Sequence, residues 1–207
     1  MKSIKIMNPI FKSITKTLSK ILDKSTSHTV CRNGMNIDPT NGSLTALDGK
    51  VLITIEKLEG IENIDILKTW DIEDESIPVE IEETKTGVYL TALDGKFPDY
   101  KKIIRKKEND KSIECCLIPK KEKGFSVFYS SIIAEQALHA GKATSFFDVE
   151  YLKMVYNLMI DCRVESFKLS LSETNSDFSG IQIEALLYNT YPMYFIVMPI
   201  FLTKGNK

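Results

Sequence analysis

The segment Gly95-Lys96-Phe97-Pro98-Asp99-Tyr100-Lys101-Lys102-Ile103-Ile104 decides how the chain is organised. Asp94-Gly95, at its start, favours a tight turn because glycine tolerates positive φ. Pro98 disfavours helix at Phe97 and favours extended structure there. The segment is therefore predicted to be a turn followed by an extended, basic stretch. The patterns on either side of it indicate two α+β halves of similar size, which this segment would connect.

Length and composition are those of a globular protein with two small domains, predicted at 1–94 and 95–207. Of the 207 residues, 43% are hydrophobic and 27% are charged, which suffices for a buried core. No apolar run approaches the roughly 18 to 20 residues of a membrane span, and the N-terminus does not resemble a signal peptide. The four cysteines lack metal-ligand spacing, so free thiols are expected. These features predict a cytoplasmic protein without membrane contact.

The first half begins with a predicted helix that carries a stripe of lysines. Asn8-Pro9 is a helix start, because Asn caps free backbone N–H groups and Pro suits the first helical position. Apolar residues then recur at helical spacing and form one face. On another face the lysines repeat every four residues, at Lys12, Lys16, Lys20 and Lys24. Because like charges at this spacing repel one another, one interpretation is an anionic partner, and the other is a solubilising face.

The rest of the first half is predicted to be a meander of strands. Asn41-Gly42 is a strong hairpin signal, and Asp48-Gly49 marks a second turn. The stretch 61–72 is ambiguous, with a short helix as one interpretation. The predicted strands span 29–37, 43–46, 51–55, 77–81 and 87–91.

The second half is predicted to combine two helices with further strands. After the strand at 112–118, a turn rich in Lys and ending at Gly124 is expected to lead to Ser126. Ser126 can cap a helix that continues to about Ala140 and is stopped by Gly141. Asp148 can cap a second helix that continues to about Ile160. Alternating apolar and polar residues predict the strands, which span 112–118, 167–171, 181–185 and 193–202.

No arrangement of residues in the sequence indicates a catalytic or metal-binding site. His28 and His139 are the only histidines, and neither lies in a ligand-like cluster. There is no pairing of Cys with His as a nucleophile, no glycine-rich phosphate loop and no set of metal-spaced carboxylates. We therefore expect no catalysis, no metal and no cofactor.

Four blocks in the second half resemble bacterial replicative sliding clamps, the β subunit of DNA polymerase III, in order and in spacing. They are Phe97-Pro98-Asp99-Tyr100, Phe147-Asp148-Val149-Glu150-Tyr151-Leu152, Gly180-Ile181-Gln182-Ile183 and Ile196-Val197-Met198-Pro199-Ile200-Phe201-Leu202. The first is similar to the family's connection between its second and third domains. The last is similar to its terminal Val-Val-Met-Pro-Met-Arg-Leu. In the first half, 30–35 and 46–52 resemble the family's middle domain. The resemblance implies two clamp-type domains, each with helices packed on antiparallel sheet.

The family resemblance also implies a function and two sites. A sliding clamp is not an enzyme; it is placed on duplex DNA by a clamp loader, encircles it, and tethers DNA polymerase and other partners. Helices that line the ring face phosphates without reading bases, and the DNA-facing candidates are Lys12, Lys16, Lys20, Lys142 and Lys153. Partners insert a short apolar peptide into a groove between these two domains. By matching motif, the groove comprises Leu47, Gly49, Lys50, Leu52, Pro98, Lys102, Ile103, Asp148, Tyr151, Ile196, Val197, Met198, Pro199, Ile200 and Leu202.

Three departures from the family pattern leave alternatives open. Lys50 stands where the family has His and Phe201 where it has Arg, so the peptide specificity can differ. The chain also has no counterpart of the family's first domain. Bacterial clamps close as dimers of three-domain chains, so two domains per chain would need a homotrimer to close a ring. The alternative is a monomeric, clamp-like module that binds or competes for clamp partners. A third and weaker interpretation is an enzyme of unknown type.

Overall fold

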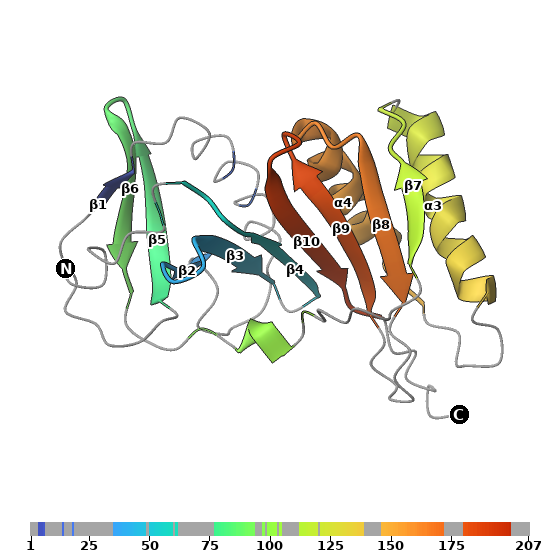
Figure 1. Ribbon diagram of the computed structural model, residues 1–207, viewed down its shortest axis with the longest axis horizontal. Coiled ribbons are helices and arrows are strands. Elements are labelled where there is room, and N and C mark those ends of the chain that lie inside the picture. Colours follow the sequence, from blue (N-terminus) through green and yellow to red (C-terminus); the bar gives the residue numbers. More distant parts are fainter. Residues whose placement is uncertain are drawn as a thin grey trace, which may run out of the picture.

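The protein is an α+β structure, as predicted, and its described strands form one antiparallel sheet (Figure 1). The computed structural model describes residues 4–6, 14, 18, 35–48, 50–59, 61, 77–93, 97, 99–102, 104, 112–119, 121–138, 146–171 and 180–199. Ten strands are ordered β1-β6-β5-β2-β3-β4-β10-β9-β8-β7 across the sheet. The first half holds β1 (Ile4–Ile6), β2 (Met35–Asp38), β3 (Ser43–Leu47), β4 (Val51–Ile55), β5 (Ile77–Thr84) and β6 (Gly87–Ala92). The second half holds η2 (Tyr100–Lys102), β7 (Ile113–Cys116), α3 (Lys121–Leu138), α4 (Val149–Asp161), β8 (Ser166–Leu171), β9 (Ile181–Leu187) and β10 (Tyr191–Val197).

The sheet runs without a break from one half of the chain to the other. β4 pairs with β10, so that Val51 lies opposite Val197 and Ile55 lies opposite Met193. This pairing was not predicted, and neither was β1, which adds to the far edge beside β6. Strands from 1–94 occupy one end of the sheet and strands from 95–207 the other. The domain boundary itself stays a prediction.

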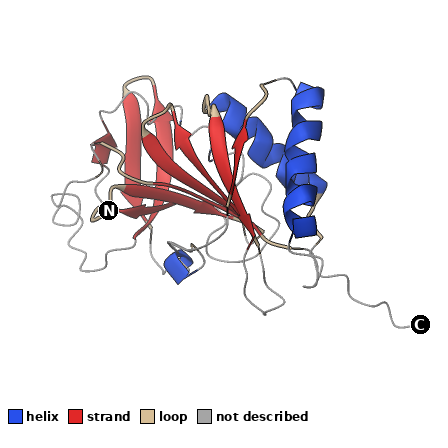
Figure 2. Cartoon of the chain, turned by 45° about the vertical axis from the view of Figure 1, so that its right-hand side comes forward, coloured by secondary structure: helices blue, strands red, loops and turns tan. Residues whose placement is uncertain are grey.

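The main core lies on the face of the sheet that the helices cover. Because side chains alternate along a strand, Val51 and Ile53 of β4 face this core, and Leu52 faces the opposite side. α3 and α4 cover the second-half end of the core face (Figure 2). Ile14 and Leu18 are helical and buried in the same core. They belong to the apolar face of the predicted first helix, whose other residues lie outside the described ranges.

The Asn41-Gly42 turn joins β2 to β3 as predicted, with Gly42 at a φ of 59°. The predicted Asp148 cap is also confirmed, because its Oδ1 accepts a hydrogen bond from the backbone N–H of Glu150 at 2.9 Å. The prediction that Ser126 caps a helix was wrong, since α3 already begins at Lys121. Gly124 suggested a turn in the sequence but lies inside the helix. There a Cβ would stand 2.0 Å from both the Ile118 carbonyl oxygen and the Tyr156 hydroxyl oxygen. This glycine serves close packing, which local sequence patterns do not reveal.

Three further boundaries differ from prediction. The segment expected to be extended after Pro98 instead contains the 3₁₀ turn η2, and the Ile104 N–H just beyond it donates a hydrogen bond to the Tyr100 carbonyl oxygen. β10 ends at Val197, before Pro199, which has no N–H to continue the ladder. β5 extends to Thr84, beyond the predicted end of that strand. The described parts of 29–37 and 61–72 are 35–37 and 61, so the rest of these two predictions lies outside the described residues.

We expect Gly124→Ala to lower the free energy of unfolding by about 1–3 kcal/mol, the usual effect of overpacking. The added methyl group would displace the Tyr156 hydroxyl, which donates a hydrogen bond to the Ile118 carbonyl oxygen. Chemical denaturation measures the change. Ser126→Ala, at an exposed position of the same helix, is the control and should alter stability by less than about 0.5 kcal/mol. Stabilisation by Gly124→Ala, as helix propensity alone predicts, would contradict this packing.

Candidate functional site

A small apolar cluster lies on the sheet face opposite the main core, where the two halves meet. Its buried members are Leu52, Phe97, Tyr100 and Ile196, and Leu47, Ile104 and Met198 pack against them partly buried. We call these seven residues the junction cluster. The Phe97 and Tyr100 rings meet edge to face, with their centroids 6.0 Å apart. The cluster thus joins the β3–β4 hairpin, the connecting segment and the end of β10.

Polar contacts anchor the connecting segment to the first half. The Tyr100 hydroxyl lies 3.3 Å from Ser43 Oγ, and Lys101 Nζ lies 2.7 Å from Asp38 Oδ2. Asp38 is fully buried and also accepts hydrogen bonds from Thr40 N and Asn41 Nδ2. Lys101 therefore compensates a buried carboxylate. Removing it would leave that charge with only neutral donors.

The β3–β4 turn holds Lys50 in a fixed backbone position beside this cluster. Asp48 Oδ1 accepts hydrogen bonds from Lys50 N at 2.8 Å and Val51 N at 2.7 Å. Met198 N donates to the Lys50 carbonyl oxygen at 2.8 Å. The turn is therefore tied to the end of β10, and Lys50 lies between the junction cluster and α4.

Tyr151 of α4 lies beneath the Lys50 side chain, with Lys50 Nζ 5.3 Å from the centroid of its ring. The pKa of Tyr151 is raised to about 12, mainly by burial and further by the nearby Asp48 carboxylate and then by Asp148. Asp48 is 7% exposed, and its Oδ2 makes no hydrogen bond of good geometry with a described residue. Partial burial and the neighbouring carboxylates therefore disfavour the ionised form of Tyr151.

We expect the Tyr151 hydroxyl to titrate near pH 12 in the folded protein, rather than near its ordinary value of 10. The stability that this raised pKa provides is complete below pH 10 and is lost as the pH rises towards 12. Ultraviolet titration of tyrosinate in the wild type and in Tyr151→Phe isolates this group. If the group that the variant loses, relative to the wild type, titrates near pH 10, the described environment of Tyr151 is incorrect.

The structure brings several predicted groove residues together. Leu47, Leu52, Ile196 and Met198 belong to the junction cluster, and Lys50 contacts Tyr151 beside it. Asp148 and Pro199 are half-buried, whereas the Val197 side chain packs in the main core on the other face. Lys102 has a described backbone only, within η2. Outside the described residues lie Gly49, Pro98, Ile103, Ile200 and Leu202.

The sequence-based site omitted four residues that the structure places there. Phe97, Tyr100 and Ile104 are members of the junction cluster, and Asp48 organises the turn that carries Lys50. The three apolar residues flank Pro98 in the connecting segment, so their proximity to a predicted groove residue was the available signal. Asp48 had a signal in the Asp-Gly turn dipeptide.

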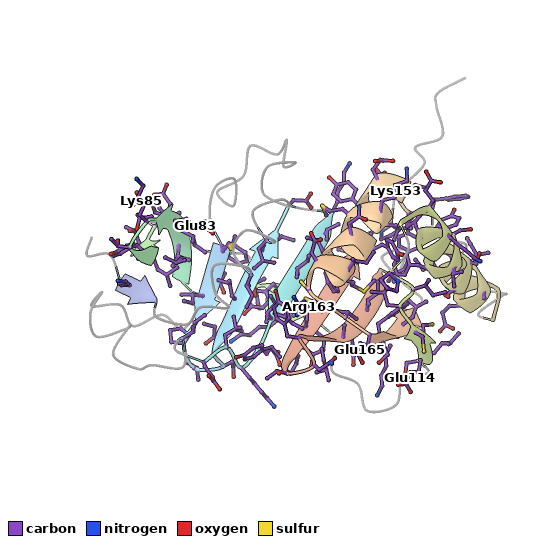
Figure 3. The ribbon with its side chains drawn as sticks, turned by 90° about the horizontal axis from the view of Figure 1, so that it is seen from above. Glu83, Lys85, Glu114, Lys153, Arg163 and Glu165 are labelled. Carbon is purple, nitrogen blue, oxygen red and sulfur yellow. The ribbon has the colours of Figure 1, made fainter. Side chains whose placement is uncertain are left out.

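The predicted DNA-facing lysines are described only at Lys153. Its side chain is exposed on the outer side of the helix layer, as Figure 3 shows. Its Nζ lies 2.8 Å from Glu150 Oε1, so this cation already has an anionic partner. Lys12, Lys16, Lys20 and Lys142 lie outside the described residues.

Three other features bear on function. Among the described residues, no group of three or more His, Cys, Asp or Glu side chains is placed to hold a metal ion. Cys115, Cys116 and Cys162 are free thiols, as expected. None of the described helices has the length and apolar character needed to span a membrane.

Solved structures similar to this chain are bacterial sliding clamps. The Helicobacter pylori β clamp bound to a DNA ligase peptide is 18% identical, with a TM-score of 0.54, over 97% of this chain and 66% of that one. DNA polymerase III subunit β from Pseudomonas aeruginosa is 15% identical, with a TM-score of 0.54, over 98% and 66%. The DNA polymerase sliding clamp from Bacillus subtilis is 15% identical, with a TM-score of 0.52, over 98% and 65%.

The similarity is one of structure rather than of sequence. No family model matches the chain, and no curated protein matches it in sequence. The chain spans 66% of the length of the Helicobacter pylori clamp, slightly less than two thirds. At such low identity the likeness shows the fold alone. The chain therefore has the α+β fold of the bacterial sliding clamps.

Proposed function

We propose that this chain is a DNA sliding clamp, which encircles duplex DNA and tethers DNA polymerase and other partners through a peptide-binding groove at the junction cluster. The observation that carries the proposal is the position of this cluster. Leu52, Ile196 and Met198 come from distant parts of the sequence and meet where the family motifs place the groove. An apolar surface with a few polar groups suits an extended apolar peptide. The clamp-type fold supports the same function.

The two ends of the sheet support assembly into a ring. β1 and β7 are the terminal strands of the described sheet and lie at opposite ends of the molecule (Figure 1). An edge strand presents backbone N–H and C=O groups that can pair with another chain. Pairing of β7 with β1 of the next copy is a head-to-tail contact, which closes only if the rotation fits. Three copies would give six domains around the DNA.

The DNA contact is assigned to the first half. Because Ile14 and Leu18 are buried in the main core, the apolar side of the predicted first helix would lie on the same sheet face as α3 and α4. Lys12, Lys16 and Lys20 lie off that apolar stripe and would face the centre of the ring. The sequences of α3 and α4 hold three lysines and four acidic residues, one net negative charge. The first helix is thus the richer source of phosphate contacts.

Topological retention on DNA tests the proposal. The protein is diluted to separate its subunits, mixed with nicked circular duplex, and concentrated so that rings close around the DNA. We expect it to co-elute with the circle in gel filtration at moderate salt and to be released when the circle is cut. Equal retention on circular and linear DNA would instead indicate ordinary binding.

The near-neutral helix layer of the second half favours one other candidate, a non-ring module that binds or competes for clamp-motif partners. The observation that favours this candidate is the ion pair between Lys153 and Glu150, because it occupies a cation on the helix face that would line a ring. This candidate predicts a monomer that binds apolar peptides and has no affinity for duplex DNA.

A further inference from the structure

We infer that Lys50 makes the proposed groove selective for peptides that carry a carboxylate beside their apolar residues. This inference rests on the proposed function, because it assigns the chemistry of the partner at the same site. It concerns one of the positions at which this chain departs from the clamp family, and it follows from how Lys50 is held.

The backbone at Lys50 is fixed on both sides. Its N–H is bonded to Asp48 Oδ1, and its carbonyl oxygen accepts a hydrogen bond from Met198 N. The side chain therefore leaves a turn of the first half that is bonded to Met198 in the second half. A fixed backbone reduces the conformational entropy lost when the ammonium binds a ligand.

The ammonium is held over an aromatic ring and stays accessible. Lys50 is exposed, and its Nζ stands 5.3 Å from the centre of the Tyr151 ring. Within the part of the chain that the structure describes, no carboxylate comes within ion-pair distance of it. The ring attracts the ammonium through its quadrupole and carries no net charge, so it does not neutralise the cation. The ammonium can therefore still form an ion pair with a ligand.

The two nearby carboxylates are engaged by backbone groups. Asp48 Oδ1 accepts two N–H groups at the turn, and Asp148 caps the N-terminus of α4. They still oppose a strongly anionic ligand, since their charges lie close to Tyr151. Their presence favours one carboxylate at Lys50 over a chain of phosphates.

The apolar part of the ligand has its own place beside this cation. Leu47 and Met198 are half-buried and pack against the junction cluster; Leu47 ends β3 three residues before Lys50, and Met198 N donates a hydrogen bond to the Lys50 carbonyl oxygen. A peptide whose apolar side chains cover these two residues would pass within reach of the ammonium. An Asp or Glu at that point of the peptide would complete the pair.

Matched peptide series test the inference. The probes are acetylated, amidated pentapeptides of Leu and Phe with one Asp at each position in turn, and the same series with Asn. Fluorescence anisotropy at low salt measures their affinities for the wild type, Lys50→Met and Lys168→Met. Lys168 is an exposed control on β8. At one position, we expect the Asp peptide to bind the wild type about fivefold more tightly than the Asn peptide.

We expect this preference to disappear in Lys50→Met, to persist in Lys168→Met and to decrease with added salt. Methionine keeps most of the length of the side chain, and the position is exposed, so the variant should fold. Equal binding of Asp and Asn peptides at every position, or a preference that survives in Lys50→Met, would overturn the inference and leave the proposed function intact. If no peptide of either series binds, the proposed groove itself is wrong.

Discussion

Replacement of Lys12, Lys16 and Lys20 with glutamate is expected to weaken the association with duplex DNA by roughly a hundredfold or more. The three lysines repeat on one face of the predicted first helix, and Ile14 and Leu18 of its apolar face are buried. Reversal of three charges removes phosphate contacts and adds repulsion. In a plot of the logarithm of affinity against the logarithm of salt concentration, the slope should also become shallower by about 0.9 for each phosphate contact removed.

A control with the same change in net charge separates local contact from overall electrostatic attraction. Lys57, Lys85 and Lys168 are exposed and none lies on a helix, since Lys57 follows β4, Lys85 lies in the β5–β6 turn and Lys168 lies on β8. Their triple replacement with glutamate should reduce DNA affinity far less. If both triple variants lose affinity equally, the lysine stripe has no special position relative to the DNA. If the stripe variant binds like the wild type, the stripe is only a solvated surface.

Tyr100→Ala is expected to lower the free energy of unfolding by about 3–5 kcal/mol, the range for removal of a large buried aromatic side chain. Tyr100 is 3% exposed, packs edge to face on Phe97, and contacts Ser43 through its hydroxyl. It therefore links the connecting segment to the first half. Tyr100→Phe removes only the hydrogen bond at 3.3 Å and should change stability by about 1 kcal/mol.

Tyr129→Ala provides the matched comparison for this effect. Tyr129 is 37% exposed on α3, so truncating it removes much less buried surface. Chemical denaturation of the three variants under identical conditions gives the ranking. A Tyr100→Ala variant as stable as Tyr129→Ala would contradict the role of the connecting segment in holding the halves together.

Local patterns predicted those parts of the fold that depend on neighbours in the chain. The Asn41-Gly42 turn and the Asp148 cap follow from backbone hydrogen bonding within a few residues, and both are present. The alternation of Phe167 and Leu169 with polar residues likewise predicted β8. These features need no knowledge of distant contacts.

Features that depend on distant contacts were missed. The pairing of β4 with β10 joins residues far apart in sequence, and neither strand carries a signal that names its partner. Gly124 suggested a turn because glycine is common in turns. The Tyr156 hydroxyl, which leaves no room for a side chain at Gly124, comes from another helix, so neighbouring residues do not reveal it. The short η2 turn is held by Lys101 and Tyr100 through contacts with Asp38 and Ser43. Tertiary contacts of this kind override local preference.

The candidate site was predictable only through family resemblance. Leu52 and Ile196 would otherwise be read as ordinary core residues, because nothing in their alternation shows that they face a second, smaller cluster. Composition and spacing do not bring Lys50 to the ring of Tyr151 either. The matched motifs placed these residues in one site, and the structure then supplied the contacts.

The absolute mass in solution, measured by light scattering over a series of concentrations, tests the ring most directly. We expect a trimer, with three times the 23.5 kDa of one chain, at concentrations where the head-to-tail contacts are saturated. A mass of one chain that persists at the highest concentration would contradict the encircling clamp. The protein would then be the peptide-binding module, with the junction cluster as its only functional surface.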